Sequence, residues 1–214
     1  MKRFFLTLIV SFMAFALSSA QESKLYVGGQ IGATFATNKV SDNTQKVNNF
    51  TFRPDVGITF DQRWMIGAKV AFSNIKTNGK DASINVGGID FSATDGITLI
   101  GLDPYARYNV FNIGSVKAWL ESDFLLDKVF SSGKSLDAFV TGFTIFPMLT
   151  YDIAPHFTLF TELNMLSLDL AYTKVKYSVT DTETTQRMFV YGFNVDASDL
   201  VSLNSITIGL IYTF

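Results

Sequence analysis

The sequence Ser205-Ile-Thr-Ile-Gly-Leu-Ile-Tyr-Thr-Phe214 decides the fold. Its even-numbered positions, from Ile206 to Phe214, are all large and apolar, whereas most of the positions between them are small or polar. Successive side chains of a strand point to opposite faces, so this alternation predicts a β-strand with one apolar face. Its length, about ten residues, is what a tilted strand needs to cross a bilayer.

Seven earlier segments repeat this alternation of apolar and polar residues. They are residues 25–35, 51–60, 64–73, 102–110, 116–126, 142–151 and 157–164. Short connections are expected at 61–63, 112–115 and 152–155, and longer polar ones at 37–49, 74–96 and 172–202, with a shorter outer one at 131–135. Such alternating connections are typical of bacterial outer-membrane barrels. The sequence therefore predicts an all-β fold, a closed antiparallel transmembrane β-barrel of about eight strands.

The composition fits a protein with a large apolar surface. The 214 residues include 21 Phe, and only 17% of the residues are charged, against roughly 25% in soluble domains. The chain has no Cys, which excludes a disulfide scaffold, a thiolate metal site and the lipid-bearing Cys of a lipoprotein. The net charge is −2 and no basic patch is visible, so no nucleic-acid partner is expected.

The N-terminus has the pattern of a secretory signal. Lys2 and Arg3 precede an apolar run over residues 4–17, and small residues lead up to Ala20. These parts in this order predict cleavage after Ala20. A membrane anchor is the alternative, but a spanning helix needs about 20 apolar residues. We therefore expect a signal peptide over residues 1–20 and one barrel domain over residues 21–214.

Alternation alone does not tell whether the apolar face points outward to lipid or inward, as in a soluble lipocalin-like barrel. Aromatic residues near the expected strand ends and the sparse charge of the polar faces favour lipid. We expect the charges on the polar faces to pair in the lumen as a structural ion network: Arg53, Asp55, Lys69, Asp103, Arg107, Lys117, Glu121, Asp123 and Glu162. A narrow polar path is the alternative, although Tyr105, Trp119, Phe146 and Phe160 on the same face favour a plugged interior.

Three of the expected strands share a short phrase in which proline stands two places after an apolar residue. The prolines are Pro54, Pro104 and Pro147. Proline cannot donate to the ladder of a sheet, and it is tolerated at edges and bulges. Because a closed barrel has no edge, we expect a local bulge at each proline.

The last strand also carries a family resemblance. Thr207-x-Gly209-x-x-Tyr212-x-Phe214 resembles the signal that the barrel-assembly machinery reads. Residues 24–214 as a whole resemble the outer-membrane β-barrel domain family, which includes small barrels of the OmpA, OmpX and OmpW types. Val27-Gly-Gly29 and Pro104-Tyr-Ala-Arg-Tyr108 look like recurring phrases of that family. The resemblance implies export to a Gram-negative outer membrane, with membrane lipid and the assembly machinery as partners.

Candidate chemistry is sparse in this sequence. The single His, His156, falls in an expected short turn, and we interpret it as a turn residue and not as a general base. One His and no Cys leave no metal constellation. Acidic residues of the outer loops are expected to be solvated, with calcium binding as the weaker alternative: Asp181, Glu183, Asp196 and Asp199. No catalytic residue, cofactor or metal is therefore expected.

Three classes of function stay open. The polar outer loops favour a non-enzymatic structural or surface-interaction protein, whose extracellular ligand the sequence does not identify. The apolar run Met188–Phe193 favours the alternative that resemblance to OmpW-type barrels implies, a narrow, porin-like channel for small, possibly hydrophobic molecules that exit sideways through the wall. The same run also fits an upward extension of a strand pair. A lipid-modifying enzyme is disfavoured, since such barrels generally use a His near the outer rim.

Deleting Phe214 tests the assembly role of the last strand. A terminal Phe at the membrane interface contributes only about 1.5–3 kcal/mol of burial, whereas a recognition strand offers its backbone edge to an assembly partner. We expect the deletion to lower sharply the amount of folded protein in outer-membrane fractions of cells, while the purified variant refolds in detergent with a modest loss of stability. Equal losses in both settings would mean that Phe214 is ordinary packing.

Overall fold

The structure is a computed structural model of the whole chain. It describes the residues in these ranges: 24–40, 43–61, 63–77, 81–94, 96–131, 133, 135–163, 166–179, 182–195 and 206–214. The expected signal peptide and its cleavage site at Ala20 lie outside the described residues. No helix within the described ranges is long and apolar enough to span a membrane.

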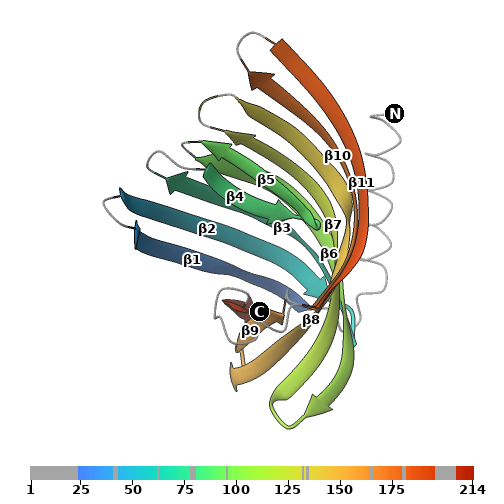
Figure 1. Cartoon of the computed structure of the whole chain (residues 1–214). Helices are drawn as coiled ribbons and strands as arrows, with labels where there is room; N and C mark the ends of the chain where they lie inside the picture. The colour runs from blue at the N-terminus through green and yellow to red at the C-terminus, as the bar shows by residue number, and fades with distance from the viewer. Residues whose placement is uncertain are drawn as a thin grey trace.

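A ring of eight antiparallel strands forms the barrel in the described part of the chain (Figure 1). In ring order they are β1 (Lys24–Val40), β2 (Asn43–Thr59), β3 (Trp64–Thr77), β6 (Ile97–Ile113), β7 (Val116–Ser131), β8 (Leu136–Ala154), β9 (Phe157–Leu163) and β12 (Ile206–Thr213). Strand β12 closes the ring, because Leu210 lies opposite Leu159 of β9 on one side and opposite Gly29 of β1 on the other. Each expected strand corresponds to one strand of the ring, so the predicted all-β closed barrel is confirmed.

Short turns gather at one end of the barrel, which we call the turn end; the opposite end is the loop end. The turns lie between β2 and β3, at Gly114 and Ser115, and at Pro155 and His156. In the first turn, Asp61 Oδ1 accepts hydrogen bonds from the backbone N–H groups of Arg63 and Trp64 at 2.7 and 2.8 Å. An Asp that bonds its own following backbone is a standard way to fix a tight turn. The expected short connections are therefore where the sequence placed them.

The apolar face of the ring points outward. Along β6, for example, Ile100, Leu102 and Val110 are exposed, whereas Tyr105 and Arg107 between them are buried. Aromatic rings pack against one another on the outside of the turn end, where the ring centres of Tyr212 lie 5.0 Å from those of Phe157 and Phe214. This arrangement is the reverse of a soluble barrel with an apolar core and a charged outer surface.

Two hairpins exist where the sequence predicted polar loops. The first, β4 (Asp81–Val86) and β5 (Ile89–Thr94), forms a separate two-stranded sheet between β3 and β6. The second, β10 (Leu166–Val179) and β11 (Thr182–Val195), extends the barrel wall toward the loop end. The expectation of loops at 74–96 and 172–202 was therefore wrong for the residues that form these strands. The interpretation of residues 188–193 as an extension of a strand pair is confirmed.

Strand β8 changes its partner halfway along its length. Leu136 to Ile145 pair with β10, and Met148 to Ala154 pair with β9. Pro147 lies at the change of partner, with Leu120 of β7 opposite it on the other side. Within the described residues, neither β10 nor β9 pairs with Pro147 itself. Proline has no backbone N–H to donate to a partner strand. The position therefore suits proline without a bulge.

The bulges expected at the three prolines are wrong. Strands β2 and β3 keep one register on both sides of Pro54, and β6 and β7 do so across Pro104. The register shifts lie at Val110 and Ile153 instead, close to the turn end. A missing N–H removes a single bond on one side of a strand, so the ladder tolerates these prolines in place.

Two glycines near the turn end, Gly57 and Gly67, lie against the buried rings of Tyr26 and Tyr105. A Cβ added at Gly67 would lie 2.5 Å from the carbonyl oxygen of Val56 and 2.6 Å from the hydroxyl of Tyr105. We expect Gly67→Ala to lower the free energy of unfolding by about 1–3 kcal/mol, the usual effect of overpacking. Gly32→Ala is the control, since its nearest neighbour is 3.8 Å away at Thr51. Urea unfolding in detergent micelles measures both, and equal midpoints would contradict this reading of the turn end.

Candidate functional site

Inward-facing residues change in character from the turn end to the loop end. A buried cluster fills the turn end: Tyr26, Met65, Tyr105, Trp119, Met148, Phe160 and Ile211. Next to it, and above it on most strands, lie buried charged residues that contact one another, which we call the charge layer: Asp55, Lys69, Arg107, Glu121, Asp123 and Glu162. The inward positions of β7 show the sequence of layers, from Trp119 through Glu121 and Asp123 to the apolar Leu125.

Arg107 is fully buried and pairs with two carboxylates. Its Nε donates to Glu121 Oε2 at 2.6 Å, and its Nη2 donates to Asp55 Oδ2 at 3.1 Å. The register of β6 and β7 places Arg107 directly opposite Glu121, so the first contact is a cross-strand pair. The guanidinium carbon also lies 4.2 Å from the ring centre of Tyr105, within cation–π range.

Lys69 joins strands that are not neighbours in the ring. From β3, its Nζ reaches Asp123 Oδ2 on β7 at 2.8 Å and Glu162 Oε1 on β9 at 3.1 Å, and it also pairs with Glu121. The other oxygen of Glu162 accepts a hydrogen bond from Gln30 Nε2 of β1 at 3.1 Å. The strands β1, β3, β7 and β9 are therefore linked around the lumen through the ammonium group of Lys69 and the carboxylate of Glu162.

Two tyrosines connect the charge layer to the turn-end cluster. The hydroxyl groups of Tyr26 and Tyr105 lie 2.7 Å apart, and the hydroxyl of Tyr105 donates to Asp55 Oδ2 at 3.1 Å. Trp119 Nε1 donates to Thr150 Oγ1 at 3.0 Å. Large rings whose polar atoms are bonded thus fill this half of the lumen, as an eight-stranded barrel of this diameter allows.

Buried acids outnumber buried bases in the described lumen. Two buried basic residues, Lys69 and Arg107, stand against seven buried acids: Asp55, Asp103, Glu121, Asp123, Asp127, Glu162 and Asp169. One carboxylate oxygen each of Asp55, Asp123 and Asp127 has no hydrogen-bond partner among the described residues. Burying a charge without a partner of opposite sign is costly, and both buried cations are already paired, so the described interior is unfavourable for a further anion.

The nine charged residues predicted for the lumen do not all meet. Six of them form the charge layer. Asp103 is buried near it, and its carboxylate accepts a hydrogen bond from the backbone N–H of Leu126 at 3.4 Å. Arg53 is half-buried and forms no ion pair with another described residue. Lys117 lies apart, where it pairs with Asp152 at 2.7 Å, each side chain being 35% exposed. Its place one residue after the start of β7 puts it at the rim of the turn end.

The loop-end half of the interior contains an apolar cluster that the sequence did not predict, interspersed with buried Asp127, Asp169 and Thr173. Val86, Ile89 and Phe91 of the β4–β5 hairpin are buried there. They belong to one cluster with inward residues of five wall strands, which we call the chamber: Ala71, Ile75, Ile97, Leu99, Leu125, Val129, Leu136, Ala138, Val140, Ala171 and Val175. The hairpin therefore lies inside the barrel. Its exposed Ser83, Asp90 and Ser92 alternate with the buried residues.

The tip of the hairpin is built from two glycines. Gly87 and Gly88 have φ angles of 57° and 76°, and Val86 pairs with Ile89 across them. Two positive φ angles in a two-residue loop define a type I′ turn, which Gly-Gly favours. This dipeptide between alternating apolar residues was the local signal that could have predicted the hairpin.

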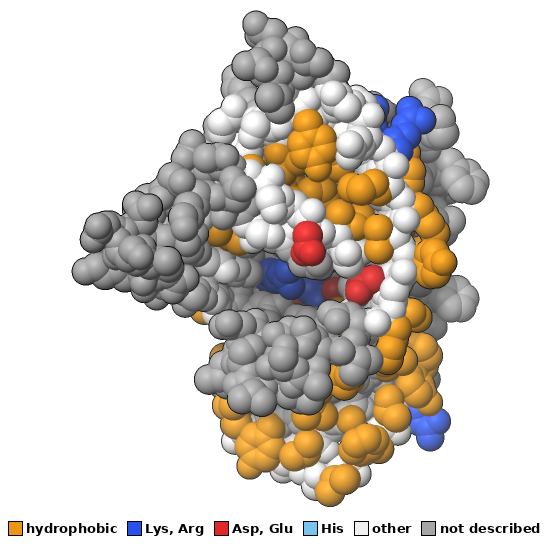
Figure 2. All heavy atoms as spheres, in the orientation of Figure 1, with side chains coloured by type: hydrophobic (Ala, Val, Ile, Leu, Met, Phe, Trp, Pro, Cys, Tyr) orange, Lys and Arg blue, Asp and Glu red, His pale blue; other side chains and the backbone are white. Residues whose placement is uncertain are grey.

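The wall is interrupted on one face of the loop-end half. Within the described residues, β1 pairs with β12 only from Tyr26 to Gln30 and beyond that only with β2, and β11 pairs only with β10. Figure 2 shows this side of the molecule with a hollow in which Lys or Arg and Asp or Glu side chains are visible, whereas hydrophobic side chains cover the surface below it. The described wall strands thus leave part of the interior uncovered above β12.

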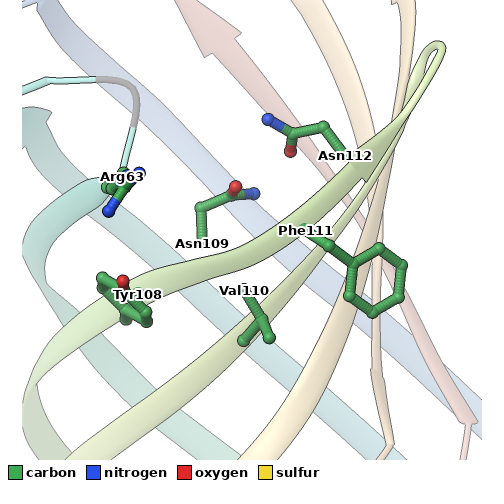
Figure 3. A pocket seen from close by; sticks show the side chains of 6 residues that line it. All are labelled: Arg63, Tyr108, Asn109, Val110, Phe111 and Asn112. Atoms are coloured by element: carbon green, nitrogen blue, oxygen red, sulfur yellow. The ribbon is translucent and has the colours of Figure 1, made fainter.

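A small cavity of about 320 Å³ lies at the turn end (Figure 3). It is lined by Arg63, Tyr108, Asn109, Val110, Phe111 and Asn112. Its polar groups also hold local backbone, since the N–H of Asn109 donates to the carbonyl of Arg63 at 2.8 Å and its side chain donates to that of Ala118 at 3.4 Å. Arg63, Asn109 and Asn112 point to one side of β6 and Val110 and Phe111 to the other.

The four residues of the predicted assembly signal lie on β12 and directly after it. Thr207 is opposite Glu162 of β9, and a Cβ on Gly209 would approach the carbonyl oxygen of Gly29 to 2.7 Å. Tyr212 packs between aromatic rings, and Phe214 is exposed, with its N–H donating to the carbonyl of Leu25 at 3.0 Å.

The other candidate residues offer little chemistry. His156 lies in the β8–β9 turn, its Nδ1 2.7 Å from the carbonyl oxygen of Thr213. Glu183 lies in β11, whereas Asp181, Asp196 and Asp199 lie outside the described residues. In the part of the chain that the structure describes, no three His, Asp or Glu residues are arranged to hold a metal ion.

Comparison with known proteins gives likenesses of fold at low sequence identity. No protein-family model matches the chain, and no curated protein matches it in sequence. Neisserial surface protein A is similar over 90% of this chain and 97% of its own, at 15% identity and a TM-score of 0.40. The outer-membrane protein AlkL in lipid bilayers is similar over 90% of both chains, at 10% identity and a TM-score of 0.47. OmpT, an outer-membrane protein of Vibrio cholerae, is similar over 86% of this chain and 64% of its own, at 16% identity and a TM-score of 0.33.

Removing Arg107 tests the charge layer. Arg107→Ala leaves the buried carboxylate of Asp55 without its bonded cation and removes one of the two cations that pair with Glu121. We expect the free energy of unfolding to fall by about 3–5 kcal/mol. Lys117→Ala removes a basic residue from a pair that is one-third exposed, so it should lower that free energy by less than about 1 kcal/mol. Unfolding by guanidinium in detergent compares the two variants. An Arg107 variant as stable as the Lys117 variant would show that water replaces the guanidinium.

Proposed function

We propose that this protein is a non-enzymatic barrel of a bacterial outer membrane, and that it lets small, neutral, apolar molecules pass sideways between its interior and the membrane. The membrane location is supported by the outward apolar face of a closed ring whose interior is charged. The signal-like N-terminus and the assembly-like sequence Thr207 to Phe214 support the same location. The location brings membrane lipid and the assembly machinery as partners.

The interruption of the wall carries the proposal of sideways passage. Lipid offers no hydrogen bonds, so strands that span a membrane are normally paired on both edges. Among the residues that the structure describes, β1 pairs only with β2 from Ile31 onward, and β11 pairs only with β10. The outward residues of β11 beside the interruption are strongly exposed aromatics, with Phe189 62%, Tyr191 79% and Phe193 70% exposed. This edge offers an apolar molecule a surface that continues from the barrel into lipid.

The interior supports a particular class of molecule. The chamber is lined by aliphatic side chains and Ala, which favour an apolar molecule through the hydrophobic effect. Beneath it, both buried cations are already paired with carboxylates, so the described lumen offers no buried cation to offset the cost of burying an anion. The charge layer and the turn-end cluster fill the lumen below the chamber, which opposes an aqueous path along the barrel axis. We therefore propose neutral apolar molecules and not sugars, ions or fatty acids.

The remaining roles rest on the sequence. A surface-interaction role through the outer loops stays a proposal from composition, since the tips at 41–42, 78–80 and 180–181 lie outside the described residues. Catalysis is opposed by the place of His156, whose ring nitrogen lies against a backbone carbonyl in a turn. We assign the charge layer a structural role, in which its ion pairs hold the strands around the lumen together.

Two nearly isosteric dyes test this function. N-phenyl-1-naphthylamine is neutral, and 8-anilino-1-naphthalenesulfonate is its anionic relative. We expect cells that carry the protein in their outer membrane to take up the neutral dye faster than matched cells without it, and to take up the sulfonate at an unchanged rate. Fluorescence of each dye as it reaches lipid measures the rates. Faster entry of both dyes would indicate a leaky membrane, and faster entry of neither would refute the function.

A further inference from the structure

We propose that the chamber is a binding site for a neutral apolar molecule and that the β4–β5 hairpin is both its internal occupant and its gate. This inference rests on the proposed function and adds the site and its regulation. The chamber is made by inward residues of the wall, and the buried face of the hairpin fills it. A ligand that enters the chamber must therefore displace the hairpin or share the space with it.

The attachment of the hairpin differs from that of the other strands. Each wall strand is held by ladders of backbone hydrogen bonds, whereas β4 and β5 pair with each other in a sheet of their own. Packing of Val86, Ile89, Phe91 and Ala93 in the chamber supplies the contact with the wall. Apolar packing is non-directional, so an apolar ligand can replace this contact without breaking the wall ladders.

The tip of the hairpin lies against the strands beside the interruption. A Cβ on Gly87 would lie 3.0 Å from Cβ of Ala171 on β10, and a Cβ on Gly88 would lie 3.6 Å from Cγ1 of Val190 on β11. Strand β11 is the one whose outer edge is unpaired within the described residues. The tip therefore braces the edge of the wall from inside, and movement of the hairpin frees that edge and the chamber together.

The two faces of the hairpin fit this gating role. The face toward the chamber is apolar, and Ser83, Asp90 and Ser92 on the other face are exposed. A hairpin that leaves the chamber keeps its polar face in water, but its apolar face and the chamber wall are both exposed, which is unfavourable. A ligand that covers the chamber wall offsets this cost. The equilibrium between the two positions thus depends on a ligand that binds the vacated chamber.

A reversible disulfide between the tip and the wall tests the gate. The chain has no Cys, so Gly87→Cys with Ala171→Cys introduces the only two thiols. Their Cβ positions lie 3.0 Å apart, somewhat below the roughly 3.5–4.5 Å of a disulfide, so the tip must shift slightly to form the bond. We expect uptake of N-phenyl-1-naphthylamine by cells with the oxidised double variant to fall to the rate of cells without the protein, and reduction by dithiothreitol to restore it. The single variants Gly87→Cys and Ala171→Cys control for strain at the turn.

The outcomes of that experiment separate the two proposals. If the wild type accelerates dye uptake and the oxidised variant does so equally, the gate is wrong and the proposed function stands. If the wild type does not accelerate uptake, the proposed function is wrong. A second measurement then decides on the binding site by itself, because it needs no transport.

Thiol labelling of purified protein provides that measurement. Ala93 of the hairpin is 6% exposed and Ala138 of the chamber wall is 0% exposed. With Ala93→Cys, we expect N-phenyl-1-naphthylamine to speed labelling by a water-soluble maleimide, since a displaced hairpin exposes this position. With Ala138→Cys, the same dye should not speed labelling, because it covers the wall. Labelling rates of Ala93→Cys that do not change with saturating dye would overturn the proposal.

Discussion

Closure of the ring by β12 is the interaction on which the rest of the structure depends. A strand wall in lipid must pair its backbone groups internally, since hydrocarbon offers no replacement. The pairing of β12 with β9 and β1 supplies this closure at the turn end, where the small residues Gly29 and Gly209 let the backbones and the ring of Phe160 come close. Once this ring is closed, the loop-end half can deviate from a regular barrel without unravelling the wall.

The interior of the closed part is held by contacts that the wall alone does not provide. Ladders join each strand only to its two neighbours, whereas Lys69 and Arg107 link strands across the lumen. Their burial is tolerated because each cation has two or more carboxylate partners. Because both buried cations are already paired with carboxylates, they leave no buried partner among the described residues for an entering anion. One set of residues thus fixes the cross-section of the barrel and sets which solutes the interior disfavours.

The wall of the ring could be predicted from the sequence because lipid imposes a strict period of two. Every strand of the ring has large outward residues, and all eight were found from this pattern. The β4–β5 and β10–β11 hairpins at the loop end were not predicted, because the alternation of apolar and polar residues is weaker there. Lys174 and Lys176 occupy outward positions of β10 that would be apolar nearer the turn end. The outward face is therefore polar there, and the segment resembles a loop although Ala171 and Val175 on the inward face are apolar.

The contacts of the candidate site were less predictable than its residues. The sequence identified charges on the polar faces, but the partner of each charge follows from strand register and from distances across the lumen. Lys117 looked like the others and lies at the rim instead. The hairpin had a local signal in Gly87-Gly88, but its position inside the barrel depends on packing against residues far away in sequence, such as Val140 and Ala171.

The lengths of the strands determine where the interruption lies relative to a membrane. The closed part of β1, from Tyr26 to Gln30, rises roughly 12 Å along the barrel axis at about 3.3 Å per residue and a tilt of about 45°. Strand β8, with 19 residues, rises roughly 45 Å on the same basis. The apolar band of such barrels is about 25 Å tall. In the proposed membrane position, the pairing of β1 with β12 among the described residues therefore ends within the height of the hydrocarbon, where lipid offers no replacement for a strand partner.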